Sequence, residues 1–376
     1  MPFNPREIIR SDLGQLGPYI PIEPYDVLSE KLGFSPNQII KLDANENPYG
    51  PSPLAQAALA NLAYPHIYPD PENHALREAL SKYLNLDPSQ IMPGSGADEL
   101  IDLITRVTLN PGDGVLICPP TFGMYEFDVR VNAGKIFEIP RNPDFSLDMT
   151  AIERAVAANK PKLLFLGSPN NPDGTLIPKS HLEYLLQLPV LVVVDEAYIE
   201  FCGMGRLGDL ATSLPIQEAH NNLIILRTFS KWAGLAGLRV GYGIFPKWMM
   251  EILWKAKQPY NVNVAASVAA IASLQDLNHL ERNVHRIIAE RARLMNNLSG
   301  FIHIRPFPSH ANFILCRVFD YKASELKHVL ASKYGILIRY FDKPGLRNMI
   351  RITVGKPDQS DKLLLALYEI LEEERT

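Results

Sequence analysis

The chain is predicted to be an α/β protein, with a mostly parallel sheet flanked by helices and a second, smaller α+β domain. Apolar runs at 115–118, 163–166, 190–194, 223–226 and 240–245 alternate with helical or turn-rich stretches, as in layered α/β sheets. From about residue 263 this alternation gives way to a long helical stretch and three further strand-like runs. A length of 376 residues also exceeds what one hydrophobic core usually holds, which favours two domains.

The elements follow one another in a definite order along the chain. The proline-rich start, with Pro18, Pro21 and Pro24, predicts an arm that packs on the smaller domain or across a dimer. The later strand-like runs lie near 312–318, 335–340 and 349–354, and a closing helix extends to Glu374. We therefore expect residues 1–44 to form the arm and part of the small domain, 45–262 the large domain, and 263–376 the carboxy-terminal small domain.

Composition and charge exclude several classes of protein. A hydrophobic content of 47% with 21% charged residues is ordinary for a globular protein. The net charge is −4 and no block of basic residues stands out, which argues against nucleic-acid binding. Nine histidines occur without a His-Glu-x-x-His pattern, so a catalytic metal is not expected.

The expected location is the cytoplasm. No signal-peptide core is visible at the amino terminus, and the apolar runs are far shorter than the roughly 20 residues that cross a bilayer. We therefore expect no membrane partner. The three cysteines, Cys118, Cys202 and Cys316, are widely spaced and odd in number, so we expect reduced thiols and no disulfide framework.

The most informative residue is Lys231, which stands between an apolar strand-like run and a glycine-rich segment that ends at Arg239. A lysine whose pKa is lowered by its surroundings is a nucleophile that forms Schiff bases with carbonyl compounds. A lone Ser-Lys pair more often begins a solvated helix, because most lysines lie on protein surfaces. The interpretation therefore depends on the segments that accompany Lys231.

Three upstream segments supply complementary groups. Asn171 lies in a turn after an apolar run, and Asp195 ends a fully apolar strand, with Tyr198 shortly after it. Ligands of open α/β sheets bind at such strand ends. Gly-Ser-Gly at 94–96 predicts a helix start whose free N–H groups favour phosphate. Alone, Asp195 would be read as a helix cap and the glycines as an ordinary turn. Together with Lys231 these groups predict pyridoxal phosphate, whose ring nitrogen pairs with a carboxylate.

At these motifs the chain resembles the fold type I pyridoxal-phosphate enzymes over nearly its whole length. The shared elements are Asn-Pro-x-Gly at 171–174, Asp-Glu-Ala-Tyr at 195–198 and Ser-Lys-x-x-Gly-Leu-Ala-Gly-Leu-Arg at 230–239. The segments at 17–21, 42–52 and 68–70 are similar to the histidinol-phosphate aminotransferase branch. The resemblance implies a large domain with a mostly parallel, seven-stranded type of sheet.

The resemblance also implies roles for individual residues. Lys231 would form the Schiff base with the cofactor, Asp195 would pair with its ring nitrogen, and Asn171 and Tyr198 would hydrogen-bond its phenolic oxygen. The cofactor phosphate would be held by hydroxyl, guanidinium and backbone N–H groups, namely those of Ser230, Arg239, Gly96, Ala97 and, from the neighbouring subunit, Tyr68. That last contact requires a homodimer with shared active sites.

Two positions depart from the family pattern. Phe122 stands where tyrosine often stacks on the cofactor, and its ring is expected to stack without the hydroxyl. Asp173 fills the variable slot of Asn-Pro-x-Gly, where threonine is common, and we expect no effect on the chemistry.

Substrate recognition is expected in the carboxy-terminal third, where Arg339 and Arg351 each lie in a β-branched run. A guanidinium binds carboxylate or phosphate through two parallel hydrogen bonds, so Arg351 is predicted to bind the glutamate carboxylate and to share the substrate phosphate with Arg339. Without the resemblance, both arginines would be read as exposed edge-strand charges. Tyr19 and Asn171 complete the predicted substrate site.

The predicted function is a pyridoxal-phosphate-dependent aminotransferase of histidine biosynthesis. It would interconvert L-histidinol phosphate and 2-oxoglutarate with imidazole acetol phosphate and L-glutamate, with Lys231 as base and Asp195 and Tyr198 as further catalytic residues. Two alternatives use the same scaffold: an aromatic or broad-specificity aminotransferase, and a threonine-phosphate decarboxylase. A third is a regulator that binds the cofactor without catalysis, which the missing basic DNA-binding segment disfavours.

Overall fold

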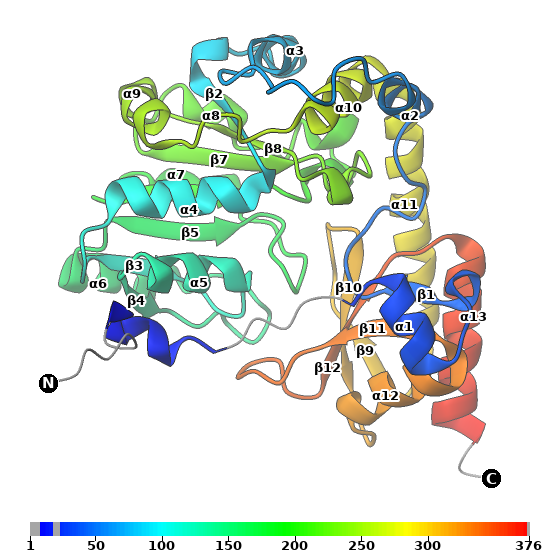
Figure 1. Ribbon diagram of the computed structural model, residues 1–376. Helices are drawn as coiled ribbons and strands as arrows, with labels where there is room; N and C mark the ends of the chain where they lie inside the picture. The colour runs from blue at the N-terminus through cyan, green and yellow to red at the C-terminus, as the bar shows by residue number, and fades with distance from the viewer. Residues whose placement is uncertain (1–7, 18–22, 374–376) are drawn as a thin grey trace, which may run out of the picture.

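The computed structural model describes residues 8–17 and 23–373, and these form two sheets with helices packed around them (Figure 1). The larger sheet has seven strands in the order β2-β8-β7-β6-β5-β3-β4. Only β8 runs against its neighbours, because both of its pairings are antiparallel. The strands are β2 (Ile91–Gly94), β3 (Gly114–Ile117), β4 (Lys135–Glu138), β5 (Leu163–Gly167), β6 (Leu191–Asp195), β7 (Leu223–Thr228) and β8 (Gly241–Ile244).

The central strands are apolar throughout because both faces of this sheet are covered. In β6, Val192 and Val194 point to one side of the sheet and pack into one core cluster, whereas Val193 packs into the cluster on the other side. Figure 1 shows α4 (Gly96–Thr108) lying across one face. That helix places Leu100, Ile101 and other apolar side chains against the sheet and its charged residues outward.

The remaining helices of this part surround the sheet, and three of them begin at a side chain that accepts a backbone N–H. These caps are Ser52, Asp148 and Asn263, with N···O distances of 2.8 to 3.2 Å. The helices are α2 (Pro53–Ala60), α3 (His74–Leu84), α5 (Gly123–Val131), α6 (Met149–Asn159), α7 (Lys179–Leu185), α8 (Leu214–Gln217), α9 (Lys247–Ala256) and α10 (Val264–Gln275).

The smaller sheet has five strands in the order β1-β11-β12-β10-β9. Its strands are β1 (Ile40–Leu42), β9 (Ile304–Pro306), β10 (Phe313–Val318), β11 (Ile336–Tyr340) and β12 (Met349–Thr353). The helices of this part are α1 (Tyr25–Leu32), α11 (Leu277–Leu298), α12 (Ala323–Tyr334) and α13 (Pro357–Tyr368), followed by a π-helical turn at Glu369–Glu373. In Figure 1, α11 runs from the larger sheet down to the smaller one, so it joins the two parts.

The predicted α/β class and the mostly parallel seven-stranded sheet are confirmed. All eight predicted strand-like runs form strands, and the closing helix is present. The sequence did not indicate β1, β2, β4 or β9, each of only three or four residues. The domain limits of 1–44, 45–262 and 263–376 stay predictions. Within the described ranges, none of the helices is long and apolar enough to cross a membrane.

Candidate active site

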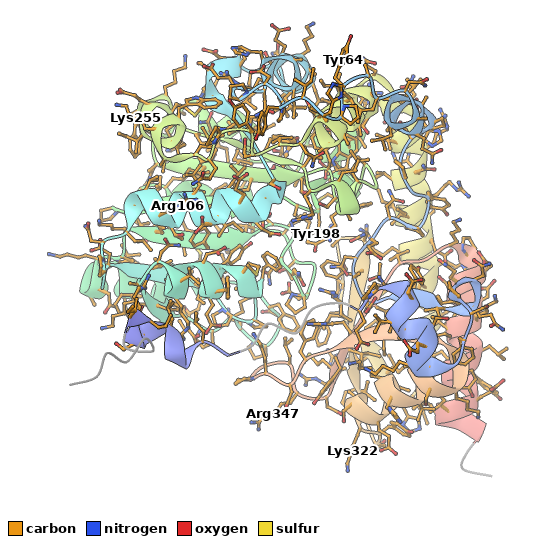
Figure 2. All side chains as sticks on the ribbon, in the orientation of Figure 1. Tyr64, Arg106, Tyr198, Lys255, Lys322 and Arg347 are labelled. Carbon is orange, nitrogen blue, oxygen red and sulfur yellow. The ribbon has the colours of Figure 1, made fainter. Side chains whose placement is uncertain are left out.

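One pocket collects most of the predicted functional side chains. It lies at the carboxyl ends of β5, β6 and β7, beside the start of α4, where parallel α/β sheets bind their ligands. Tyr198, labelled in Figure 2, stands where the larger sheet faces the smaller one. The predicted residues that line the pocket are Ala97, Phe122, Asn171, Asp195, Tyr198, Ser230, Lys231 and Arg239.

Lys231 follows β7 and points its amine into this pocket. Its Nζ donates one hydrogen bond, to the carbonyl oxygen of Ala44 at 3.3 Å, and lies 5.9 Å from the ring centre of Tyr198. Burial, together with the positive charge of Arg351, lowers the pKa of Lys231 from 10.5 to about 8. A sizeable fraction of this amine is therefore neutral near physiological pH, as a nucleophile or base requires.

Asp195, at the end of β6, is buried and held by two donors. Tyr125 donates its hydroxyl to Oδ2 at 2.8 Å, and the backbone N–H of Ala197 donates to Oδ1 at 3.1 Å. Burial raises the pKa of Asp195 to about 6, and the hydrogen bond from Tyr125 opposes that rise. The side chain is thus largely a carboxylate at neutral pH, and it suits a protonated ring nitrogen.

Asn171 and Arg351 meet from opposite parts of the molecule. Arg351 on β12 donates from Nη1 to Asn171 Oδ1 at 2.6 Å and from Nη2 to the Asp43 carbonyl oxygen at 2.7 Å. Its Nε is buried without a partner among the described residues. Burial lowers the pKa of Arg351 to about 10, and the nearby guanidinium of Arg339 acts in the same direction. Arg339 is the cross-strand neighbour of Arg351.

The phosphate region is built where α4 begins. Gly96 has a φ of +78°, and a Cβ added there would lie 2.5 Å from Nη2 of Arg239, so glycine allows the guanidinium to approach the helix start. Arg239 also pairs with Asp98 at 2.8 Å. Ser230 completes the region and accepts a hydrogen bond from the Thr228 hydroxyl at 2.9 Å.

The chemical groups that line this pocket fit pyridoxal phosphate. An amine, a carboxylate, an amide and a phenol surround the centre of the pocket, and a guanidinium, a hydroxyl and a helix N-terminus lie at one end. Those groups match an aldehyde, a ring nitrogen, a phenolic oxygen and a phosphate. The glycine at Gly96 supports the fit independently, since any side chain there would displace Arg239.

The two departures from the family pattern are both accommodated. Phe122 lines the pocket and meets Tyr125 edge to face, with ring centres 5.6 Å apart. Asp173 is fully buried, accepts hydrogen bonds from Asn170 and from the backbone N–H of Thr175, and so braces the turn that presents Asn171.

Tyr68, a predicted phosphate ligand, lies away from this pocket. Tyr68 is 79% exposed and stacks on Tyr260 with ring centres 4.8 Å apart, so it does not line the pocket of its own chain. Its contact with a neighbouring subunit stays a prediction. Tyr19 lies outside the described residues.

Two residues of the site were not predicted from the sequence. One is Tyr125, whose hydroxyl holds Asp195 across 70 residues of chain. Asn45 donates from Nδ2 to the Tyr198 hydroxyl at 3.0 Å across 153 residues. Neither position carries a local signal for its partner, because both contacts exist only after the chain has folded.

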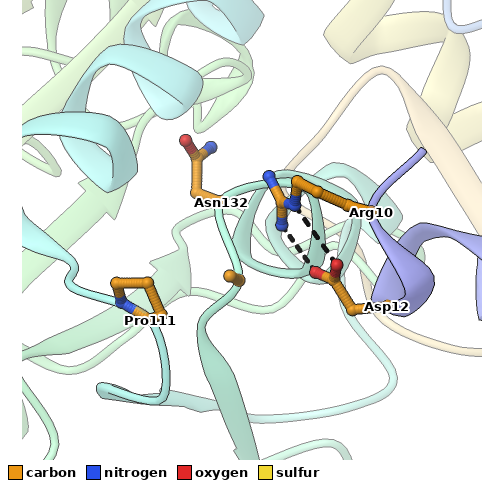
Figure 3. Close-up of a pocket in the computed structure, with 5 residues that line it drawn as sticks. Arg10, Asp12, Pro111 and Asn132 are labelled. Carbon is orange, nitrogen blue, oxygen red and sulfur yellow. Dashed lines mark hydrogen bonds and ion pairs between the residues drawn. The ribbon is translucent and has the colours of Figure 1, made fainter. Parts of the chain in front are cut away.

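A second hollow contains none of the predicted residues (Figure 3). It is lined by Arg10, Asp12, Pro111, Asn132 and Ala133, and Figure 3 shows Arg10 turned toward Asp12. That ion pair is about half exposed on both sides, so water screens it and it contributes little energy. The hollow therefore offers no competing candidate for the active site.

Comparison with known proteins supports the same site. The aminotransferase class I and II family matches residues 37–367. The chloroplastic histidinol-phosphate aminotransferase of Nicotiana tabacum is 51% identical over 360 residues, which cover 96% of this chain and 86% of that relative. The histidinol-phosphate aminotransferase of Roseiflexus castenholzii (strain DSM 13941 / HLO8) is 49% identical over 378 residues, covering 98% and 100%.

A solved structure agrees with this relationship in three dimensions. The histidinol-phosphate aminotransferase of Sinorhizobium meliloti, in complex with pyridoxal-5′-phosphate, superposes with a TM-score of 0.86 at 28% identity, covering 97% of this chain and 98% of that one. The family predicted from the sequence motifs is confirmed. By its family match and its relatives, the chain belongs to the class I and II aminotransferases and, within them, to the histidinol-phosphate aminotransferases.

Proposed function

We infer that this chain is a pyridoxal-phosphate-dependent aminotransferase of histidine biosynthesis. It interconverts L-histidinol phosphate and 2-oxoglutarate with imidazole acetol phosphate and L-glutamate. The single observation that carries this conclusion is the placement of the Lys231 amine in one pocket with Asp195, Asn171 and Arg239. Family membership identifies the substrate class.

Lys231 is the base that moves the proton. When bound, pyridoxal phosphate supplies an aldehyde that captures amines and a ring that accepts the electron pair left by removal of the α-proton. The Nζ of Lys231 would take up that proton and release it again, a transfer that needs the neutral amine. Its pKa of about 8 keeps this form accessible at neutral pH.

The remaining side chains of the pocket would orient the cofactor ring through its nitrogen and its phenolic oxygen. Asp195 would hold a proton on the ring nitrogen of the cofactor, and the hydroxyl of Tyr125 orients Asp195. Because Arg351 occupies Asn171 Oδ1, the amide nitrogen of Asn171 is the donor left for the ring's phenolic oxygen. Tyr198 is the second donor to that oxygen.

Substrate selection is assigned to the arginines on the smaller sheet. The guanidinium carbon of Arg351 lies 5.2 and 5.6 Å from the ring centres of Phe313 and Phe341, and hydrogen bonds from both of its terminal nitrogens fix the plane of the guanidinium. A fixed plane suits the two parallel hydrogen bonds of a carboxylate. Arg339, beside Arg351 and over Phe341, adds charge for the substrate phosphate.

The proposal includes a homodimer in which Tyr68 completes the phosphate site of its partner. The support is its exposed ring, which lies on a surface with Tyr64 and Ile67, both more than half exposed. Mixed dimers of Tyr68→Ala and Lys231→Ala chains contain one site with both residues intact if Tyr68 crosses the interface. Activity regained on mixing supports the crossing, and heterodimers that stay inactive contradict it.

The proposed location is the cytoplasm, where thiols remain reduced. Cys118, Cys202 and Cys316 are all free and buried, and burial raises the pKa of Cys118 to about 12. The tobacco relative is named as chloroplastic, so fractionation of the source cells is the direct test. Enzyme recovered with an organelle marker would contradict the cytoplasmic location.

A coupled assay tests the function itself. L-histidinol phosphate, phosphothreonine and phenylalanine are offered at matched concentrations with 2-oxoglutarate, and both glutamate and carbon dioxide are followed. We expect glutamate chiefly from histidinol phosphate. Carbon dioxide released from phosphothreonine would indicate a decarboxylase, a preference for phenylalanine would indicate an aromatic aminotransferase, and cofactor binding without turnover would indicate a regulator.

A further inference from the structure

Asn45 is a buried residue in the turn after β1, and its partners come from several distant segments. Its backbone is left-handed, with φ of 56°, and it is 1% exposed. Its backbone N–H donates to the Thr353 hydroxyl at 3.0 Å, and that hydroxyl donates to Asn45 Oδ1 at 3.1 Å. Asn312 donates from Nδ2 to the carbonyl oxygen of Asn45 at 3.0 Å.

These bonds fix which end of the Asn45 amide faces Tyr198. Since Oδ1 is taken by Thr353, Nδ2 is directed at the Tyr198 hydroxyl, 3.0 Å away. A tyrosine hydroxyl has one proton and two lone pairs. With one lone pair accepting from Asn45, the proton of Tyr198 points elsewhere, and the open side of Tyr198 is the pocket. An accepted hydrogen bond also makes the hydroxyl a stronger donor.

We propose that Asn45 is a positioning residue, which directs the Tyr198 hydroxyl proton toward the phenolic oxygen of the bound cofactor and anchors that hydroxyl to β12. The inference rests on the proposed function, in which Tyr198 donates to that oxygen. Asn45 touches neither substrate nor cofactor, so it acts only through Tyr198.

The anchor joins the cofactor side of the site to the substrate side. Thr353 lies on β12, the strand that carries Arg351, and Arg351 donates to the Asp43 carbonyl oxygen at 2.7 Å. The segment 43–45 is therefore bonded to β12 at both ends. One rigid connection holds the substrate arginine and the hydroxyl of Tyr198 in a fixed relation.

Burial and two nearby carboxylates keep the hydroxyl of Tyr198 protonated. Burial raises the pKa of Tyr198, although Arg351 and the hydrogen bond with Asn45 oppose that rise. Asp195 and Asp98 act to raise the pKa further. The Lys231 amine is the other ionisable group that faces the ring. A phenol that stays protonated is a hydrogen-bond donor, as the proposed role requires.

The test uses the absorbance of the cofactor bound to the holoprotein, titrated with pH. A proton donated to the phenolic oxygen stabilises negative charge there and lowers the pH midpoint of the spectral change. Asn45→Gly keeps the left-handed backbone without strain and removes the donor, so we expect the midpoint to rise by about 0.5 to 1 pH unit. In a Tyr198→Phe background the same change should have no further effect, because its target is gone.

Two further variants test the same role without placing a glycine at position 45. In Asn45→Asp a carboxylate replaces the amide and takes the proton of Tyr198, so we expect a midpoint shift at least as large as that of Tyr198→Phe. Thr353→Val removes the anchor and should raise the midpoint as well. The matched control Thr353→Ser keeps the hydroxyl and should leave the midpoint unchanged.

The outcomes separate this inference from the proposed function. The inference would be overturned if Asn45→Asp left the midpoint unshifted, or if Asn45→Gly shifted it equally with and without Tyr198. In either case the wild-type protein would still show the normal spectrum of the bound cofactor, so the proposed function would stand. A wild-type protein that binds no pyridoxal phosphate would overturn the proposed function and the inference together.

Discussion

Two lysines beside the larger sheet, Lys231 and Lys257, differ in their hydrogen bonds. Lys257 donates from Nζ to the carbonyl oxygens of Pro71 and Gln258 and to Asn261 Oδ1, at 2.8 to 3.1 Å. For Lys231, the described residues provide a single acceptor, the Ala44 carbonyl oxygen at 3.3 Å. Burial lowers the pKa of both side chains. A lysine with three acceptors holds structure together, whereas one with a single long bond is free to react.

Two buried arginines repeat this contrast. Arg227 donates from Nε and Nη2 to Glu196 at 3.0 and 2.9 Å and also bonds Thr212, so its charge is fully compensated. Arg351 keeps Nε without a partner in the described part of the chain and bonds only neutral oxygens. Arg351 therefore has a donor left for a ligand, whereas the charge of Arg227 is already paired.

The largest expected effect comes from removing the reactive amine. Lys231→Ala should reduce turnover by at least about 10⁴-fold, because it removes both the nucleophile and the general base. Lys257→Ala, the matched control, should instead lower the free energy of unfolding by about 1 to 3 kcal/mol, because it removes three hydrogen bonds that tie distant loop segments together. Turnover and chemical denaturation of both variants check the contrast. A Lys257 variant as inactive as the Lys231 variant would break it.

The next effect concerns the carboxylate at the ring nitrogen. Asp195→Asn keeps the shape of the side chain and removes its charge, so turnover should fall by roughly 10²- to 10³-fold. Single-turnover kinetics with histidinol phosphate measure the loss at the proton-transfer step. A normal rate in this variant would remove Asp195 from the catalytic set.

The spare capacity of Arg351 should appear in substrate binding. Arg351→Lys cannot form two parallel hydrogen bonds, and we expect KM for glutamate to rise about 10- to 100-fold. Arg339→Lys should change KM for histidinol phosphate more than KM for glutamate. Steady-state kinetics with both substrates test this division, and equal effects of the two variants on both substrates would contradict it.

Because the pKa of Lys231 is lowered, the rate of cofactor binding should change about tenfold with pH. The neutral fraction of Lys231 rises as pH passes through about 8, below its ordinary value of 10.5, so apoprotein should combine with pyridoxal phosphate about tenfold faster at pH 9 than at pH 7. Stopped-flow absorbance gives the rate, with Lys231→Ala as the blank. A rate still rising steeply above pH 10 would show an ordinary lysine.

The smallest effect is expected for Tyr125→Phe. The variant loses one hydrogen bond to Asp195 and keeps the ring stacked on Phe165, so turnover should fall only about three- to tenfold. A loss as large as that of Asp195→Asn would show that Tyr125 does more than orient the carboxylate.

The sequence predicted those parts of the site that are local in the chain. Lys231, Asp195 and Asn171 each lie at or just after the end of a strand, and parallel strands bring their carboxyl ends to one edge, so the three could be placed together in advance. The sequence could not predict the roles of Asn45 and Tyr125, because these roles depend on the packing of distant segments. Strands β1 and β9 were not predicted for a related reason. A strand of three residues shows no periodicity in the sequence, and only pairing with the rest of the smaller sheet defines it.

The most direct test of the central claim is to reduce the holoprotein with borohydride and map the peptide that carries the cofactor. Reduction makes the bond between lysine and cofactor permanent, so the modified residue identifies the reactive amine. We predict that the label lies on Lys231 in the peptide after β7. A label on Lys257, or one spread over exposed lysines, would contradict the claim that the lysine with a single hydrogen bond is the one that reacts.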